Sequence, residues 1–210
     1  MNREDAKNTK TFFWVSSLRV LRVFAVVLCL GPGVASADSY GGGEARPRRS
    51  GFAIGFGLGP SLYLGAGDLD SKKGVGGDLN LRVGTSATPN FLWQLELQGG
   101  GYLVELTSEA GTKTIFNSHA TLTLGGQVYV REALWLRGGL GVASFHEQEG
   151  RNGPELEGTR QSGLAMTAGG GYDLFRRGIF ALDLEVVTSG AVFDGGFMGH
   201  SAMLLGLMWY

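Results

Sequence analysis

From Gly51 onward the sequence alternates between bulky apolar residues and small or polar ones. In the first run, Phe52, Ile54, Phe56 and Leu58 alternate with glycine and alanine. The same period of two residues returns in further runs up to the last residue of the chain. Side chains two residues apart lie on one face of a β-strand, whereas a helix needs a period near 3.6. The pattern therefore predicts strands, and no stretch supports a long amphipathic helix.

Eight strands are predicted, at residues 51–64, 75–86, 91–105, 115–130, 134–145, 162–175, 179–188 and 199–210. Long connections alternate with short ones. The long ones are 65–74, 106–114, 146–161 and 189–198, and the short ones are 87–90, 131–133 and 176–178. This indicates an up-and-down meander with both termini at its short-turn end. An even strand number with this asymmetry is typical of a transmembrane barrel, and strands of about ten residues suffice to cross at a tilt.

The two faces of the predicted sheet differ in a way that decides the class. One face is continuous, bulky and apolar, and the other combines glycine, alanine and threonine with charged residues. A soluble barrel buries its apolar face, whereas a transmembrane barrel turns that face to lipid. The chain has 37 glycines among 210 residues, a much larger share than the usual value of about 7%. Such small residues suit the narrow interior of an eight-stranded barrel. The predicted fold is all-β, an eight-stranded antiparallel up-and-down transmembrane β-barrel.

Two further features refine this picture. Aromatic residues collect near the short turns, and we interpret them as an interfacial girdle: Phe91, Trp93, Trp135, Phe175, Phe180, Trp209 and Tyr210. The alternation loses its phase around Gly99–Gly101, where a β-bulge would shift which side chains face outward.

The first 50 residues do not follow the strand pattern. Residues 1–37 are predicted to be a cleaved signal peptide, with arginines before the apolar run 23–30 and a cleavage site at Ala35 and Ala37. The apolar run is shorter than the roughly 20 residues of a spanning helix. Residues 38–50 are interpreted as a flexible periplasmic leader whose arginines are solvated. The barrel domain is predicted at 51–210, without cysteine.

The last strand ends in two aromatic residues, Trp209 and Tyr210. This resembles the C-terminal sorting signal of bacterial outer-membrane β-barrels. Together with the signal peptide, it makes the chain similar to the small eight-stranded outer-membrane barrel family, typified by outer membrane proteins A, X and W. The resemblance implies the outer membrane of a Gram-negative bacterium, with long loops outward and both termini periplasmic. It also implies contact with outer-membrane lipid and lipopolysaccharide, insertion by the barrel-assembly machinery, and no cofactor.

Charged residues on the predicted inward face stand at similar distances from the short turns. We expect Arg82, Glu96, Arg137 and Asp183 to form a ring across the lumen, with Glu185 above it. A buried charge must be paired, because its desolvation costs several kcal/mol. The predicted role of the ring is a structural plug, and the alternative is a gated ion path.

The sequence offers little for catalysis or metal binding. His146 falls in a predicted long loop without a recognised metal-ligand spacing. His200 and Ser201 are similar to the layout of outer-membrane lipid A deacylases, but the His-x-Ser spacing is not matched. Adjacent residues on a strand point to opposite faces, so no catalytic, cofactor or metal residue is predicted. The near-neutral charge of −1 gives no footprint for nucleic acid.

The sequence therefore predicts an outer-membrane barrel with a structural, envelope or surface-contact role, in which the loop from His146 to Gln161 faces outward. The alternative is a porin-like channel for small solutes or ions. Further alternatives are a lipid-modifying enzyme and a soluble, exported ligand-binding barrel of the lipocalin type. The oligomeric state stays open, with a monomer favoured.

Overall fold

The computed structural model describes residues 49, 51–108, 111–150 and 158–210. Eight strands follow one another along the chain, as predicted. They are β1 (Phe52–Gly67), β2 (Gly74–Thr88), β3 (Phe91–Ser108), β4 (Gly111–Tyr129), β5 (Leu134–Gly150), β6 (Gly158–Arg177), β7 (Phe180–Phe193) and β8 (Gly196–Trp209). No helix among the described residues is long and apolar enough to span a membrane. The chain divides into two units, Met1–Gly42 and Gly43–Tyr210, and all eight strands belong to the second.

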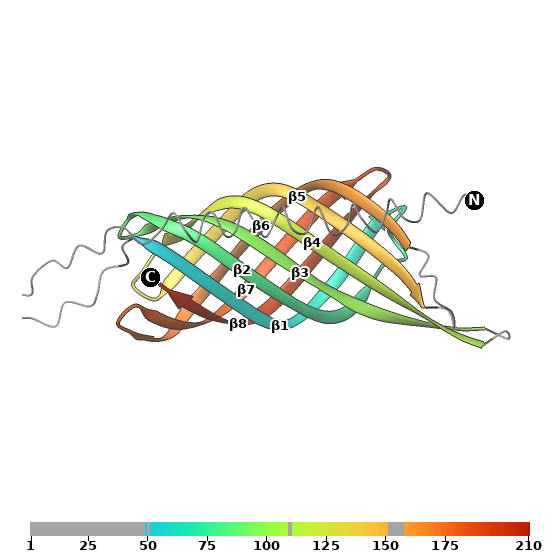
Figure 1. Cartoon of the computed structure of the whole chain (residues 1–210), viewed down its shortest axis with the longest axis horizontal. Coiled ribbons are helices and arrows are strands. Elements are labelled where there is room, and N and C mark those ends of the chain that lie inside the picture. Colours follow the sequence, from blue (N-terminus) through green and yellow to red (C-terminus); the bar gives the residue numbers. More distant parts are fainter. Residues whose placement is uncertain (1–48, 50, 109–110, 151–157) are drawn as a thin grey trace, which may run out of the picture. The chain divides into compact units, whose positions relative to one another are not determined.

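The strands form one closed antiparallel barrel in chain order, in which β8 pairs with β1 (Figure 1). Starting at Gly55 and passing from partner to partner around all eight strands leads back to β1 at Gly65, ten residues further along. Such a stagger obliges the strands to tilt, typically by about 35–45°. The tilt is visible in Figure 1. The predicted class, an eight-stranded antiparallel up-and-down barrel, is confirmed.

The alternation in sequence matches the two faces of this barrel. Leu58 and Leu140 point outward and are 57% and 70% exposed, whereas Asn80 and Gln98 point inward and are fully buried. A barrel that hid its apolar face from water would show the opposite arrangement. The described part of the barrel is therefore apolar outside and largely polar inside.

The predicted long connections are mostly strand, which corrects the sequence interpretation. β1 continues to Gly67, β3 to Ser108 and β5 to Gly150, and only two residues join β7 to β8. Backbone hydrogen bonds can extend a hairpin beyond the point where one face needs to be apolar, so alternation underestimates strand length. His146 consequently lies in β5, and the predicted loop from His146 to Gln161 is reduced to 151–157, which lies outside the described residues.

The register is regular where a bulge was expected. Pairing of β2 with β3 passes through Gly99, Gly100 and Gly101 without a shift. The irregularities lie instead between Ser86 and Thr88 and between Asp173 and Phe175. Both are close to short turns of the barrel.

Pairing at the end opposite the short turns, the hairpin end, is uneven. β2 pairs with β3 only as far as Gly101, whereas β3 and β4 stay paired to Ser108. β7 pairs with β6 from Leu164, whereas β5 and β6 are paired from Gly158. The hairpin-end parts of β3, β4, β5 and β6 therefore form a sheet that extends beyond the closed barrel, and the β3–β4 hairpin projects clearly in Figure 1.

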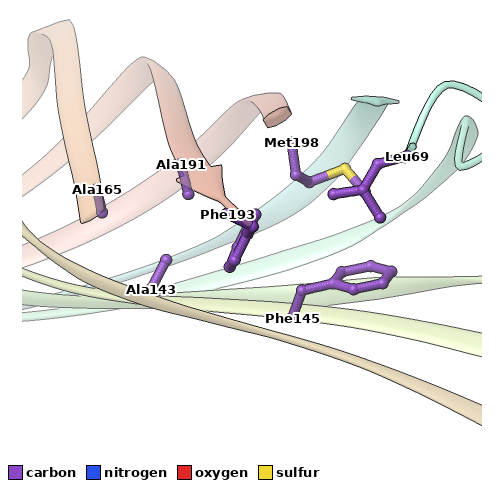
Figure 2. Close-up of a cluster of buried hydrophobic side chains, with 7 residues drawn as sticks. All are labelled: Leu69, Ala143, Phe145, Ala165, Ala191, Phe193 and Met198. Atoms are coloured by element: carbon purple, nitrogen blue, oxygen red, sulfur yellow. The ribbon is translucent and has the colours of Figure 1, made fainter. Parts of the chain in front are cut away.

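Apolar side chains cluster inside the barrel at the hairpin end. Leu69, in the connection between β1 and β2, points toward Met198, and Phe145 and Phe193 lie beside them (Figure 2). All four are at most 5% exposed. A smaller apolar cluster lies nearer the short turns, made of Ala53, Leu92, Ala181 and Met208.

Candidate functional site

The structure brings all five predicted lumen charges together. Arg82 on β2, Glu96 on β3, Arg137 on β5, and Asp183 and Glu185 on β7 are each at most 5% exposed. Arg137 donates from Nη1 to Glu185 Oε2 at 2.6 Å, and its Nη2 lies 2.9 Å from Glu96 Oε1. Arg82 Nη2 lies 3.2 Å from Glu185 Oε1 and 3.8 Å from Asp183 Oδ2. The five side chains form one connected network, called the charge network below.

Glu185 occupies the centre of the charge network rather than the layer above it, where it was predicted. Its two oxygens receive bonds from Arg82 and Arg137, and the Asn80 amide donates to Oε1 at 3.3 Å. The stagger of the barrel causes the difference, because the level of a side chain depends on its strand as well as on its distance from a turn. A buried carboxylate held by two guanidinium groups and an amide is well compensated.

Inward glycines make the space for these side chains. A Cβ atom at Gly57 would lie 2.5 Å from Glu185 Oε1 and 2.7 Å from Asn80 Oδ1, closer than real Cβ atoms approach. A Cβ atom at Gly206 would overlap the Asp183 carboxylate. The glycine-rich face is therefore a packing requirement of the charge network.

Trp135 does not belong to the predicted aromatic girdle. It is fully buried inside the barrel, where the guanidinium carbons of Arg82 and Arg137 lie 5.4 and 5.3 Å from its ring. Its phase could have shown this, because Trp135 stands two residues before Arg137 and so shares its face. Trp93, Phe175 and Trp209 do face outward and are exposed.

A second buried polar cluster, which sequence reasoning did not single out, lies toward the hairpin end. His200 Nε2 is 2.8 Å from Asp78 Oδ2, and Gln98 donates to the same oxygen at 3.3 Å. Ser189 donates to Gln98 at 2.6 Å, and the His119 ring meets that of His200 edge-on at 4.9 Å. In the sequence, the alternation of polar and apolar residues along these strands indicates that Asp78 and Gln98 face the interior. Both polar clusters lie in the interior of the barrel.

The structure also shows where the residues considered for catalysis and for metal binding lie. His200 faces the lumen, while Ser201 faces outward with its hydroxyl 3.0 Å from that of Thr188, so the two cannot share a proton. Among the described residues, no group of three or more histidines, cysteines or carboxylates is placed to hold a metal ion.

The two C-terminal aromatic residues predicted as a sorting signal lie on opposite faces of the barrel wall. Trp209 packs edge-on against Phe180 with ring centroids 5.4 Å apart, and Tyr210 turns inward, where its hydroxyl bonds that of Tyr129. Ala35 and Ala37 lie outside the described residues. Arg49, the part of the leader that the structure describes, is buried, so its interpretation as a solvated residue was wrong.

No protein-family model matches the chain, and no curated protein matches it. Solved structures do. The outer-membrane protein Ail of Yersinia pestis, the attachment invasion locus protein, crystallised with the heparin analogue sucrose octasulfate, is 17% identical with a TM-score of 0.56 over 75% of this chain and 99% of that one. A second crystal structure of Ail is 14% identical with a TM-score of 0.52 over 75% and 98%. Neisserial surface protein A is 9% identical with a TM-score of 0.48 over 75% and 96%. The chain thus has the fold of the small eight-stranded outer-membrane β-barrels.

Proposed function

We propose that this chain is an integral outer-membrane barrel with a structural or envelope role and a filled lumen. The observation that carries the proposal is the apolar outer surface of the barrel, which is the inverse of the polar surface of a soluble protein. Bulky apolar side chains cover the outside of every strand, among them Leu58, Leu140, Leu164 and Leu205, each at least half exposed. Contiguous apolar surface of this extent is not stable in water, and lipid is the solvent that suits it. Removal of the signal peptide, recognition of Trp209 and Tyr210 as a sorting signal and insertion by the assembly machinery belong to the same proposal.

The lumen supports a structural role over conduction. The charge network joins β2, β3, β5 and β7 across the interior, and apolar clusters lie nearer both ends. An eight-stranded barrel has an interior that side chains can fill. These contacts support a barrel that strengthens the membrane wall rather than one that transports solutes.

A surface-contact role is the second part of the proposal. With the short turns in the periplasm, the sheet made by the hairpin ends of β3 to β6 would stand outside the membrane, in contact with lipopolysaccharide or a partner. Leu103 and Phe116 remain exposed on it. Exposed charged side chains at this end are of both signs: Asp68, Asp70 and Asp194 are acidic, and Lys73 and Arg160 are basic. They do not form a basic surface among the described residues, so the polyanion bound by Ail is not carried over to this chain.

Conduction of ions or small solutes is the alternative. It is favoured by one observation, that both ring nitrogens of the buried His119 and the Oγ1 of Thr121 have no hydrogen-bond partner in the protein. Unpartnered buried polar atoms call for water. A continuous file of such water would make a conductive path.

Four measurements test the proposal. The mature protein should remain in the membrane fraction after osmotic release and should show heat-modifiable migration after detergent extraction. Recovery in the soluble fraction without detergent would favour the lipocalin-like alternative instead. In planar bilayers the purified barrel should give no steady conductance, whereas stable, well-defined steps would establish the channel alternative. Incubation with lipopolysaccharide, followed by mass spectrometry of lipid A, should leave its acyl chains unchanged.

A further inference from the structure

Arg49 stands before β1 and inserts its side chain into the short-turn end of the barrel. Its guanidinium carbon lies 3.3 Å from the centroid of the Tyr129 ring and 5.7 Å from that of Tyr210. A planar cation over an aromatic face is attracted by the ring quadrupole, and more strongly when both are shielded from water. Two tyrosines from distant parts of the sequence thus provide an aromatic wall for one guanidinium group.

The same group makes two polar contacts. Arg49 Nη2 donates to the Glu132 carbonyl oxygen at 2.5 Å and to Asp173 Oδ2 at 2.9 Å. The side chains of Arg49 and Asp173 are only 7% and 3% exposed. A carboxylate, a carbonyl oxygen and an aromatic face together match the flat, multiply donating guanidinium, whereas an ammonium group offers no plane to stack.

The barrel itself holds these receiving groups in place. The hydroxyls of Tyr129 and Tyr210 are hydrogen-bonded to each other. Burial raises the pKa of the Tyr210 hydroxyl, and a tyrosine is protonated at neutral pH even at its ordinary pKa of about 10. The Asp173 amide donates to the Ala133 carbonyl oxygen at 2.9 Å, which ties β6 to the β4–β5 turn. The receiving groups are therefore built by strand ends and a turn, and Arg49 reaches them from outside the sheet.

We propose that the short-turn end of the barrel is a guanidinium-binding site, which Arg49 of the same chain occupies. The bound side chain fastens the chain at Arg49, ahead of β1, to the short-turn end of the barrel. A tethered ligand has a high effective concentration, so the site stays filled in the intact chain. A free guanidinium compound should bind only when Arg49 is absent.

Proteolysis tests whether Arg49 is held in this site. Trypsin must take the arginine side chain into its specificity pocket to cleave after it, so the bond following Arg49 should be protected in the folded, detergent-solubilised barrel. Asp173→Asn removes the charged partner without changing its shape. It should speed cleavage after Arg49 by about tenfold or more, because cleavage follows the population of the open form. Mass spectrometry identifies the cut, since the shortened chain then begins at Ser50.

Asp194→Asn is the matched control, because it neutralises an exposed aspartate at the opposite end of the barrel. Its cleavage rate should equal that of the wild type. Heat-modifiable migration must show that each variant is folded. Equal rates of cleavage after Arg49 in the wild type and in Asp173→Asn would overturn the proposal.

Ligand binding tests whether the site recognises a guanidinium group, and this test does not depend on the folding of Asp173→Asn. In Arg49→Ala, methylguanidinium at concentrations that leave the barrel folded should shift the NMR signals of the Tyr129 ring. Methylammonium has the same charge without the plane and should not shift them, and neither compound should act on the wild type. The absence of a shift with methylguanidinium in Arg49→Ala, or equal shifts with both compounds, would contradict a guanidinium site.

Discussion

Arg137 and Glu185 bind each other across the lumen, with Arg137 Nη1 2.6 Å from Glu185 Oε2, although β5 and β7 are not neighbours in the sheet. Glu185 also receives Arg82 from β2. One carboxylate therefore connects three strands that the backbone ladder does not pair directly. This relationship makes Glu185 the carboxylate that bridges the two guanidinium groups of the charge network.

Glu185→Gln should destabilise the barrel by about 3–5 kcal/mol, the usual cost of removing one partner of a buried ion pair. Arg137 would keep Glu96 and Arg82 would keep the more distant Asp183, but both guanidinium groups would lose the carboxylate that bridges them. Chemical unfolding of the refolded barrel in lipid vesicles measures the change. Glu105→Gln, which neutralises an exposed outward residue of β3, serves as the control and should be nearly neutral. An equal effect of the two substitutions would show that the charge network contributes no stability.

The small residues beside the charge network give a second prediction. Gly206→Ala should destabilise the barrel by about 1–3 kcal/mol, the range for overpacking a filled interior, because its Cβ atom would overlap the Asp183 carboxylate. Gly138→Ala is the matched control, since its Cβ atom would meet only the Thr167 carbonyl oxygen, at 3.4 Å. The same unfolding measurement should rank Gly206→Ala well below Gly138→Ala in stability. If both variants matched the wild type, the interior would have room that the structure does not show.

These residues also show how far the sequence alone could lead. The strict period of two was enough to predict eight antiparallel strands, their apolar outer face and the inward direction of Arg82, Glu96 and Arg137. Period alone does not report height along the barrel axis, because the ten-residue stagger shifts the level from strand to strand. Glu185 was therefore placed one layer too far from the short turns.

Two other features depended on information that local patterns do not contain. Backbone pairing carried β3 and β5 well past the end of their alternation, since a hairpin in water needs no apolar face. Arg49 is held by Asp173, 124 positions away in the sequence, so a basic residue in a glycine-rich leader gave no local sign of burial. Trp135 is different, because its position two residues before Arg137 already indicates the inward face.

The outer surface leads to a prediction that depends on depth in the bilayer. Leu140→Arg should cost about 2–4 kcal/mol in a lipid bilayer if Leu140, in the central part of β5, lies near the midplane. Val75→Arg, on an equally exposed residue close to the hairpin end of β2, should cost about 0–1 kcal/mol. Unfolding in vesicles of one lipid composition compares the two. Two equally harmless arginines would mean that this surface does not face hydrocarbon.

Tryptophan fluorescence distinguishes the two faces without altering the charge network. Trp93 and Trp209 face outward and are about half exposed, whereas Trp135 is fully buried in the lumen. Bromine on the acyl chains quenches only fluorophores that it can approach closely. The experiment uses the protein without residues 1–37, and so without Trp14. In vesicles with brominated chains, its emission should be partly quenched, and replacing both Trp93 and Trp209 by phenylalanine should leave a remainder, from Trp135, that is nearly unquenched. Strong quenching of that remainder would place Trp135 against lipid and contradict its position beneath Arg82 and Arg137.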